Sequence, residues 1–133
     1  MTTNTAGSAA QEYHTRQTHF LRYDLTETSA LTGTIGILPA GAIIDAANSG
    51  VYVNTVFSGG NPTVDIGITG STTKYASALD LDAALGFVVL DETSGDTLKV
   101  TVDTPLIYTL VLDTPVAADG DASIIIQYFP RLG

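Results

Sequence analysis

Apolar side chains alternate with polar ones in several short segments, and this pattern constrains the fold of the 133-residue chain more than any other feature. A β-strand directs successive side chains to opposite faces, so an alternating segment buries one face and exposes the other. Segments 51–57, 64–68 and 97–103 follow this pattern, and segments 18–25 and 34–38 follow it less regularly. The residues expected to face a core are Val51, Val53, Phe57, Val64, Ile66, Ile68, Leu98, Val100 and Val102.

The composition also favours an all-β protein. Thr, Val and Ile contribute 20, 10 and 10 residues, and their β-branched side chains suit a pleated sheet. Turn residues cluster at 58–62, 94–96 and 119–121, and we expect a short helix or an ordered loop only at 76–86. About eight short strands separated by such turns predict a two-sheet β-sandwich, and a jelly roll is the expected type. Glycines inside β segments, which we expect at bulges or tight bends, are Gly33, Gly36, Gly67 and Gly70.

The chain is expected to form a single β-sandwich domain, residues 15–133, preceded by an extended N-terminal arm, residues 1–14. The arm shows no core-forming periodicity, and it lacks the basic and apolar regions of a secretory signal. It is either a frayed terminus or a segment that becomes ordered on a partner. Residues 13–23 hold both histidines and two of the five basic residues. This stretch either docks on an acidic surface or forms a solvated strand edge.

The charge balance and the absence of cysteine exclude several classes of function. Fourteen acidic and five basic residues give a net charge of −9, which excludes a free-standing nucleic-acid binder because phosphate contacts need Lys and Arg. Without cysteine, the chain can form no disulfide, thiolate metal site or cysteine nucleophile. No apolar run reaches the roughly 18 residues of a membrane helix.

No motif indicates catalysis or a cofactor. Neither a G-x-S-x-G elbow nor a phosphate-binding glycine loop followed by Lys occurs. His14 and His19 have an odd spacing, which would place them on opposite faces of a strand. Acidic residues cluster at 80–82, 91–96 and 119–121, where they either hold calcium or serve as ordinary turn residues. A carbohydrate-binding sandwich would present a solvent-facing row of aromatic side chains, and the expected strands show none.

Three segments, 87–90, 106–112 and 124–126, are apolar at consecutive positions and therefore on both faces of a strand. One face can cover the core, and the other must be hidden by a different segment of the same chain or by a neighbouring subunit. If a subunit covers it, the candidate oligomer-interface residues are Phe87, Val89, Ile107, Thr109, Val111 and Ile125.

The order of several segments resembles a known family. Residues 37–44 read Ile-Leu-Pro-Ala-Gly-Ala-Ile-Ile and precede the strand 51–57, a Gly/Asn loop and the segment 64–68. Residues 118–128 form a turn followed by an aliphatic strand that ends in an aromatic residue. This series is similar to that of the jelly-roll cement, or decoration, proteins of tailed bacteriophages. The similarity does not extend to the arm, to 72–96 or to the C-terminal Pro-Arg-Leu-Gly.

The resemblance implies a non-enzymatic structural protein on the outer surface of an HK97-type capsid, made in the cytoplasm of the bacterial host. Its partners would be the major capsid protein and further copies of itself, as a homodimer or homotrimer that bridges adjacent capsomers, with no nucleic-acid, membrane or cofactor partner. Another virion module, such as a head-fibre base, a tail component or a receptor-binding jelly roll, is the alternative. The arm would contact the capsid through Thr2, Thr3, Asn4, Thr5, Tyr13, His14 and Arg16.

Overall fold

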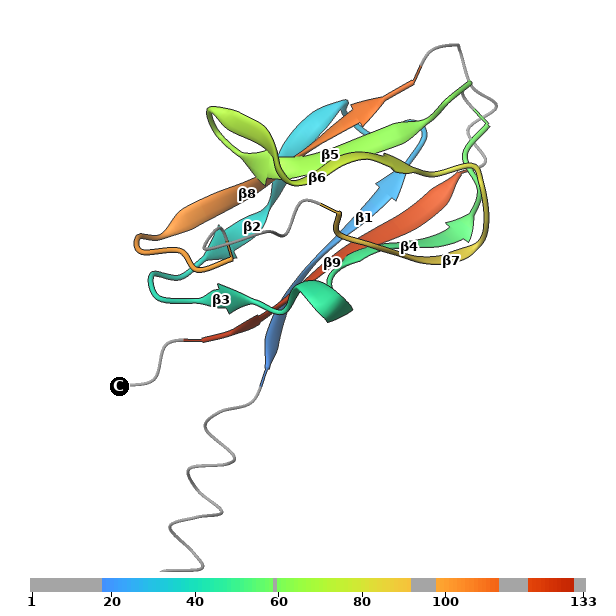
Figure 1. Cartoon of the computed structure of the whole chain (residues 1–133). Coiled ribbons are helices and arrows are strands. Elements are labelled where there is room, and N and C mark those ends of the chain that lie inside the picture. The colour runs from blue at the N-terminus through green and yellow to red at the C-terminus, as the bar shows by residue number, and fades with distance from the viewer. Residues whose placement is uncertain (1–17, 59, 92–97, 113–119, 131–133) are drawn as a thin grey trace, which may run out of the picture.

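Two antiparallel sheets stack face to face and enclose the core (Figure 1). The computed structural model describes residues 18–58, 60–91, 98–112 and 120–130. Sheet 1 contains β1 (His19–Thr26), β3 (Ile43–Ile44), β4 (Gly50–Thr55), β7 (Gly86–Val89) and β9 (Asp121–Phe129). Sheet 2 contains β2 (Thr32–Leu38), β5 (Thr63–Ile68), β6 (Ser71–Asp80) and β8 (Thr104–Val111), and one short 3₁₀ turn, η1 (Ala46–Asn48), precedes β4.

The strand order is that of a jelly roll. Sheet 1 has the order β1-β9-β4-β7, and β3 pairs with the end of β9 beyond β4. Sheet 2 has the order β2-β8-β5-β6. The chain therefore passes repeatedly from one sheet to the other. β9 lies between β1 and β4, which come much earlier in the sequence. This order confirms the predicted all-β, two-sheet sandwich.

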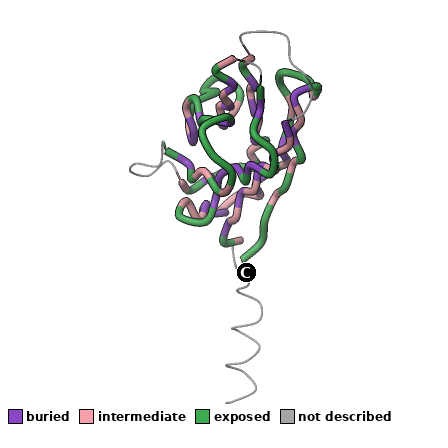
Figure 2. The backbone as a smooth tube through the Cα atoms, turned by 90° about the vertical axis from the view of Figure 1, so that its right-hand side faces the viewer, coloured by how far each residue is buried: buried purple, intermediate pink, exposed green. Residues whose placement is uncertain are grey.

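The core lies between the sheets and is built from alternate residues of each strand. Val51, Val53, Phe57, Val64 and Ile66 are buried, as the alternation predicts, and Ile68 is half-buried. The interior also holds the inward side chains of β1, β6, β8 and β9, including Leu25, Tyr75, Leu79, Tyr108, Leu110, Ile124 and Ile126. Figure 2 shows buried and exposed positions alternating along the chain.

The prediction of a strand at 97–103 is wrong over the described part of that segment. Residues 98–100 lie against 41–44, with N–H···O bonds from Gly41 to Val100 and from Ile44 to Leu98. The chain then bends at 101–102, where Val102 is 66% exposed, whereas Val100 is buried and Leu98 half-buried. The alternation of apolar and polar residues continues through this bend in the sequence. The pattern of side-chain types alone therefore did not reveal where the extended segment ends.

The short helix allowed at 76–86 does not form. Residues 76–80 belong to β6, and an ordered loop over 81–85 leads to Gly86 at the start of β7. Ala76 and Leu79 pack into the core opposite β5, and this packing overrides the helix preference of an alanine-rich stretch. Three of the four glycines mark the predicted irregularities, since the register shifts at Gly36 and around Gly67, and Gly70 has a φ of 84° in the turn after β5. The prediction is wrong for Gly33, which pairs in regular register with Tyr108.

In the described part of the chain, no helix is long and apolar enough to cross a lipid bilayer.

Candidate functional site

The six predicted interface residues do not form one surface. Phe87, Val89 and Ile125 lie on the outer face of sheet 1, because their strand neighbours Val88, Ile124 and Ile126 point inward. Ile107, Thr109 and Val111 lie on the outer face of sheet 2, where they alternate with the buried Leu106, Tyr108 and Leu110. The two outer faces are on opposite sides of the sandwich, so a single flat contact can include only one group.

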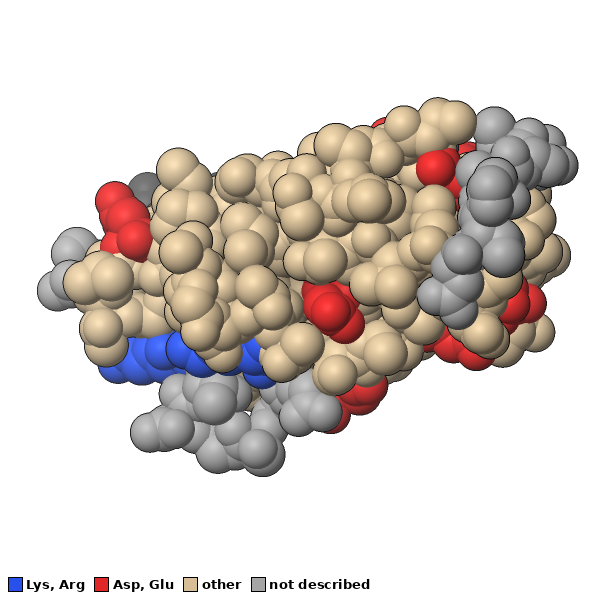
Figure 3. Space-filling model, turned by 90° about the horizontal axis from the view of Figure 1, so that it is seen from above, with Lys and Arg blue, Asp and Glu red and all other residues tan. Residues whose placement is uncertain are grey.

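The outer surface around β8 is rich in uncharged β-branched residues. In the register of sheet 2, Thr32 lies opposite Thr109, Thr34 opposite Ile107, and Thr63 opposite Val111. Ile37 is 57% exposed and Val111 is 41% exposed. Figure 3, viewed from the side of β5, β6 and β8, shows a mostly uncharged surface with isolated acidic groups and with basic side chains along its lower left edge. We call this surface the β8 face and define it by Thr32, Thr34, Ile37, Thr63, Pro105, Ile107, Thr109 and Val111.

The outer face of sheet 1 differs from the β8 face in carrying aromatic and charged side chains together. Tyr52 of β4 lies directly opposite Phe87 of β7, and the same cross-strand row continues through Ser123 of β9 to Asp24 of β1. Tyr52 is 48% exposed and Phe87 is 41% exposed. The expectation that no aromatic row faces solvent is therefore wrong for this sheet. Farther along the same face lie the exposed Phe20, Ile43 and Phe129.

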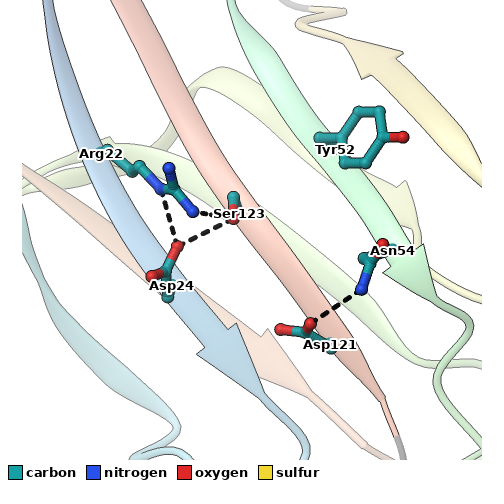
Figure 4. A pocket seen from close by; sticks show the side chains of 6 residues that line it. All are labelled: Arg22, Asp24, Tyr52, Asn54, Asp121 and Ser123. Carbon is teal, nitrogen blue, oxygen red and sulfur yellow. Dashed lines mark hydrogen bonds and ion pairs between the residues drawn. The ribbon is translucent and has the colours of Figure 1, made fainter.

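A pocket of about 270 Å³ opens on this face beside Tyr52. Two groups of hydrogen bonds cross its floor, and Figure 4 shows them. Asp24 Oδ1 accepts from Arg22 Nε at 2.9 Å and from Ser123 Oγ at 2.8 Å, while Asn54 Nδ2 donates to Asp121 Oδ2 at 3.1 Å. The lining residues come from three adjacent strands and are Arg22, Asp24, Tyr52, Asn54, Asp121 and Ser123.

The hydrogen bonds hold the Asp24 side chain in place and in its charged form. The bond from Ser123 and the bond from Arg22 lower the pKa of Asp24 below its ordinary value, since both favour the carboxylate. Arg22 Nη2 also donates a long hydrogen bond to Ser123 Oγ at 3.4 Å. Arg22 and Asp24 are both more than half exposed. Their ion pair therefore orients the two side chains but adds little to the stability of the fold.

The acidic residues at 80–82 act as ordinary turn residues, whereas Asp91 accepts the N–H of the distant Ser77. The Asp80 side chain accepts the backbone N–H groups of Asp82 and Ala83, which is the usual behaviour of Asp in a turn. The Asp82 N–H lowers the pKa of Asp80, and the Asp80 carboxylate raises the pKa of Asp82. No cluster of three or more potential metal ligands occurs among the described residues. Parts of two other acidic clusters, 92–96 and 119, lie outside them.

The predicted N-terminal contact site lies entirely outside the described residues. This applies to every residue named for the arm: Thr2, Thr3, Asn4, Thr5, Tyr13, His14 and Arg16. His19, the other histidine of the basic stretch, is exposed at the start of β1, with its ring against that of Tyr128 at a centroid distance of 5.8 Å.

Sequence reasoning missed the pocket because strands distant in the chain contribute to it. The pairing of Asp24 with Ser123, and of Asn54 with the start of β9, depends on β9 lying between β1 and β4. A local signal existed, since Arg22 and Asp24 occupy the solvent-facing positions of β1 and Tyr52 and Asn54 those of β4. Without the strand order, these positions could not be joined into one site.

Comparisons with known proteins find likeness in structure. A chain of the capsid asymmetric unit of cyanophage Pam1 aligns over 86% of this chain and 84% of its own length, with a TM-score of 0.56 and 23% identity. A chain of the acid-stable capsid of Helicobacter pylori bacteriophage KHP30 aligns over 86% and 89%, with a TM-score of 0.64 and 14% identity. At these identities the likeness is one of fold. No protein-family model and no curated protein sequence matches the chain.

Proposed function

We propose that the protein is a structural component of a tailed-phage virion that decorates the outer surface of the capsid and bridges adjacent capsomers. The observation that carries the proposal is the jelly-roll fold, which aligns over 86% of the chain with chains from two phage capsids. The resemblance of segments 34–68 and 106–129 to capsid cement proteins supports the same function independently of that alignment.

In this proposal, copies of the protein associate through the β8 face as a dimer or trimer. Interface centres are poor in charge, and the β8 face carries threonines and aliphatic residues in a chain with a net charge of −9. Asp65 of β5 is a charged residue within this surface, since it lies opposite Thr109 on the same outer face, and its carboxylate accepts the Ala78 N–H at 2.7 Å. The charged outer face of sheet 1 would instead remain in solvent.

The mechanical effect of such a protein comes from the number of attachments. Packaged DNA pushes the shell outward, and a bridge across each capsomer seam resists the separation of its two sides. Each contact can be weak, because a second contact made by a molecule that is already attached benefits from a high effective concentration. Residues 1–14 are the proposed contact with the major capsid protein.

A binding assay tests this function. Purified protein is mixed with expanded heads that lack it, the heads are pelleted, and bound copies are counted per capsid subunit. We expect saturation at a fixed stoichiometry and better survival of the heads on heating. Failure to bind heads at any ratio would contradict the proposal. Labelling of intact virions at the tail would favour a different virion module.

A charged residue in the β8 face should separate the copies. We expect Ile107→Asp to lower the oligomer mass measured by light scattering, because an unpaired carboxylate in an apolar contact loses its hydration. The matched control is Leu85→Asp, which places the same charge on a loop residue that is 66% exposed. If Ile107→Asp keeps the mass of the unmodified protein, the β8 face is not the contact.

Deletion of residues 1–14 tests the arm separately. The described sandwich begins after the arm, so we expect the melting temperature to change little and the occupancy on heads to fall. Unchanged occupancy would remove the arm from the proposal.

A further inference from the structure

We propose that the pocket on the outer face of sheet 1 binds a neutral saccharide, with Tyr52 as the surface on which a sugar ring stacks. The pocket, of about 270 Å³, lies between β1, β9 and β4 and combines an exposed aromatic ring with planar polar groups. The inference goes beyond the proposed capsid function and does not depend on it.

The polar groups of the pocket are held in place before any ligand arrives. Asp24 is fixed by Arg22 and Ser123 at 2.9 and 2.8 Å, and Asp121 by Asn54 at 3.1 Å. Among the described residues, Asp24 Oδ2, Asp121 Oδ1 and the Asn54 side-chain oxygen have no hydrogen-bond partner. These free acceptors, together with the Arg22 N–H groups, match the hydroxyl groups of a sugar, each of which donates and accepts.

The charge of the pocket selects against anionic ligands. Arg22 supplies one positive charge, whereas Asp24 and Asp121 supply two negative charges. A phosphate or sulfate would meet a site of net negative charge, with the guanidinium already paired to Asp24. A neutral ligand with several hydroxyl groups meets no such repulsion.

The aromatic side chains provide the apolar half of the site. Tyr52 is 48% exposed, and Figure 4 shows its ring face-on to the viewer, next to Asn54. Phe87, its direct cross-strand neighbour and 41% exposed, extends the apolar surface on the side away from Ser123. A sugar ring has apolar C–H faces and a polar rim, so this pairing of an aromatic surface with hydroxyl-binding groups suits it.

The polar groups favour a small hydroxylated ligand over a protein partner at this point. A protein interface that covered the pocket would remove three charged side chains from water, and two of their carboxylate oxygens lack a partner among the described residues. Burying such groups without new hydrogen bonds is costly. A sugar supplies those bonds, and the pocket faces away from the β8 face, so contact between copies through that face leaves it open.

The test is a titration of the ¹⁵N-labelled full chain with maltohexaose, cellohexaose, mannohexaose and chitohexaose at millimolar concentrations. We expect at least one of them to shift the amide signals of Tyr52, Asn54 and Ser123 in a saturable manner. Tyr52→Ala should weaken that binding about tenfold, because the stacking surface is lost, and Tyr52→Phe should retain it. The matched control, Val102→Ala, changes an exposed residue outside the pocket and should bind like the unmodified protein.

Three outcomes would overturn the inference. In the first, none of the four oligosaccharides shifts the pocket signals. In the second, inorganic phosphate or a heparin hexasaccharide shifts them more strongly than any neutral sugar. In the third, no sugar binds and Tyr52→Ala reduces attachment to heads, which would identify the surface as a protein contact. Head binding is measured by pelleting and sugar binding on the isolated chain, so each proposal can fail without the other.

Discussion

Glu27 is a carboxylate buried in the interior at the end of β1, where it is 4% exposed. It accepts hydrogen bonds from the backbone N–H of Ser58 at 2.8 Å, from the Ser58 hydroxyl, and from the N–H of Gly120 at 2.9 Å. None of these partners is a cation. The side chain thus joins three segments that are distant in the sequence: the turn after β1, the chain after β4 and the start of β9.

Removal of this carboxylate should destabilise the fold strongly. We expect Glu27→Ala to lower the free energy of unfolding by about 2–4 kcal/mol, since the buried Gly120 N–H and the part-buried Ser58 N–H both lose their acceptor. Glu27→Gln, which keeps one acceptor oxygen, should lose less. Denaturant unfolding measures both, with Thr28→Ala at the adjacent exposed position as the control. A loss for Glu27→Ala no larger than that for Thr28→Ala would contradict the assigned role.

Two buried tyrosines should make the protein sensitive to alkali. Tyr108 donates to the carbonyl oxygen of Ala30 at 2.9 Å and lies 3.2 Å from the Tyr23 hydroxyl. Burial, and then the bond to Tyr23, raise the pKa of Tyr108, and burial raises that of Tyr75. A raised pKa in the folded state means that the neutral phenol contributes stability below the unfolded value of about 10. That contribution is lost as the pH rises through the folded value.

We therefore expect the free energy of unfolding to decrease above about pH 10. Tyr108→Phe should be less stable at neutral pH, because the Ala30 carbonyl loses its donor, and should lose less of its remaining stability in alkali. Denaturant melts at a series of alkaline pH values measure this, with tyrosinate absorbance as a second readout. Parallel pH profiles for the two proteins would show that Tyr108 is not responsible.

At the scale of single elements, β6 contains an irregularity that places its side chains. Ala78 has a φ of 53°, and its N–H donates to Asp65 of β5 at 2.7 Å. The register between β5 and β6 shifts at this point. As a result, both Ala76 and Leu79, which a regular strand would direct to opposite faces, are buried in the core.

Glycine at position 78 should relieve the backbone strain. A left-handed conformation costs an L-residue about 1–2 kcal/mol, and the extra chain entropy of glycine offsets about 0.5–1 kcal/mol of the gain. We expect Ala78→Gly to raise the free energy of unfolding by about 0.5–1 kcal/mol. Ala83→Gly in the exposed loop after β6 is the control, and it should be neutral or slightly destabilising. A destabilised Ala78→Gly variant would show that the conformation is not strained.

The same elements show what the sequence could and could not predict. Alternation identified the strands around Val51 and Val64, because a strand with one buried face has an apolar residue at every second position. It failed at Val102, where the chain bends. The helix or loop expected from 76 onward was wrong at 76–80, where pairing with β5 outweighs local preference. It also identified exposed apolar positions without assigning them to a face. Ile107 and Ile125 look alike in the sequence, and only the strand order separates them.

At the scale of the whole molecule, the two outer faces differ in chemistry and the net charge is −9. Copies that associate through the uncharged β8 face must overcome their mutual repulsion. We expect salt to strengthen this association, since the Debye length falls from about 30 Å at low ionic strength to about 8 Å under physiological conditions. Sedimentation across a salt series measures the effect. Weaker association at higher salt would indicate a contact made by ion pairs.

The position of β9 also affects how the chain folds during its synthesis. Among the described residues, β9 is the last strand in the sequence and the one strand of sheet 1 that pairs with β1 and with β3, and it pairs with β4 as well. Until β9 has left the ribosome, β1 lacks its sheet 1 partner among the described residues, so we expect sheet 1 to close only after residue 129 has emerged. A chain that ends before β9 leaves unpaired strand edges, which make it prone to degradation or aggregation. The fold therefore acts as a check on synthesis, because only a copy that includes β9 can complete sheet 1.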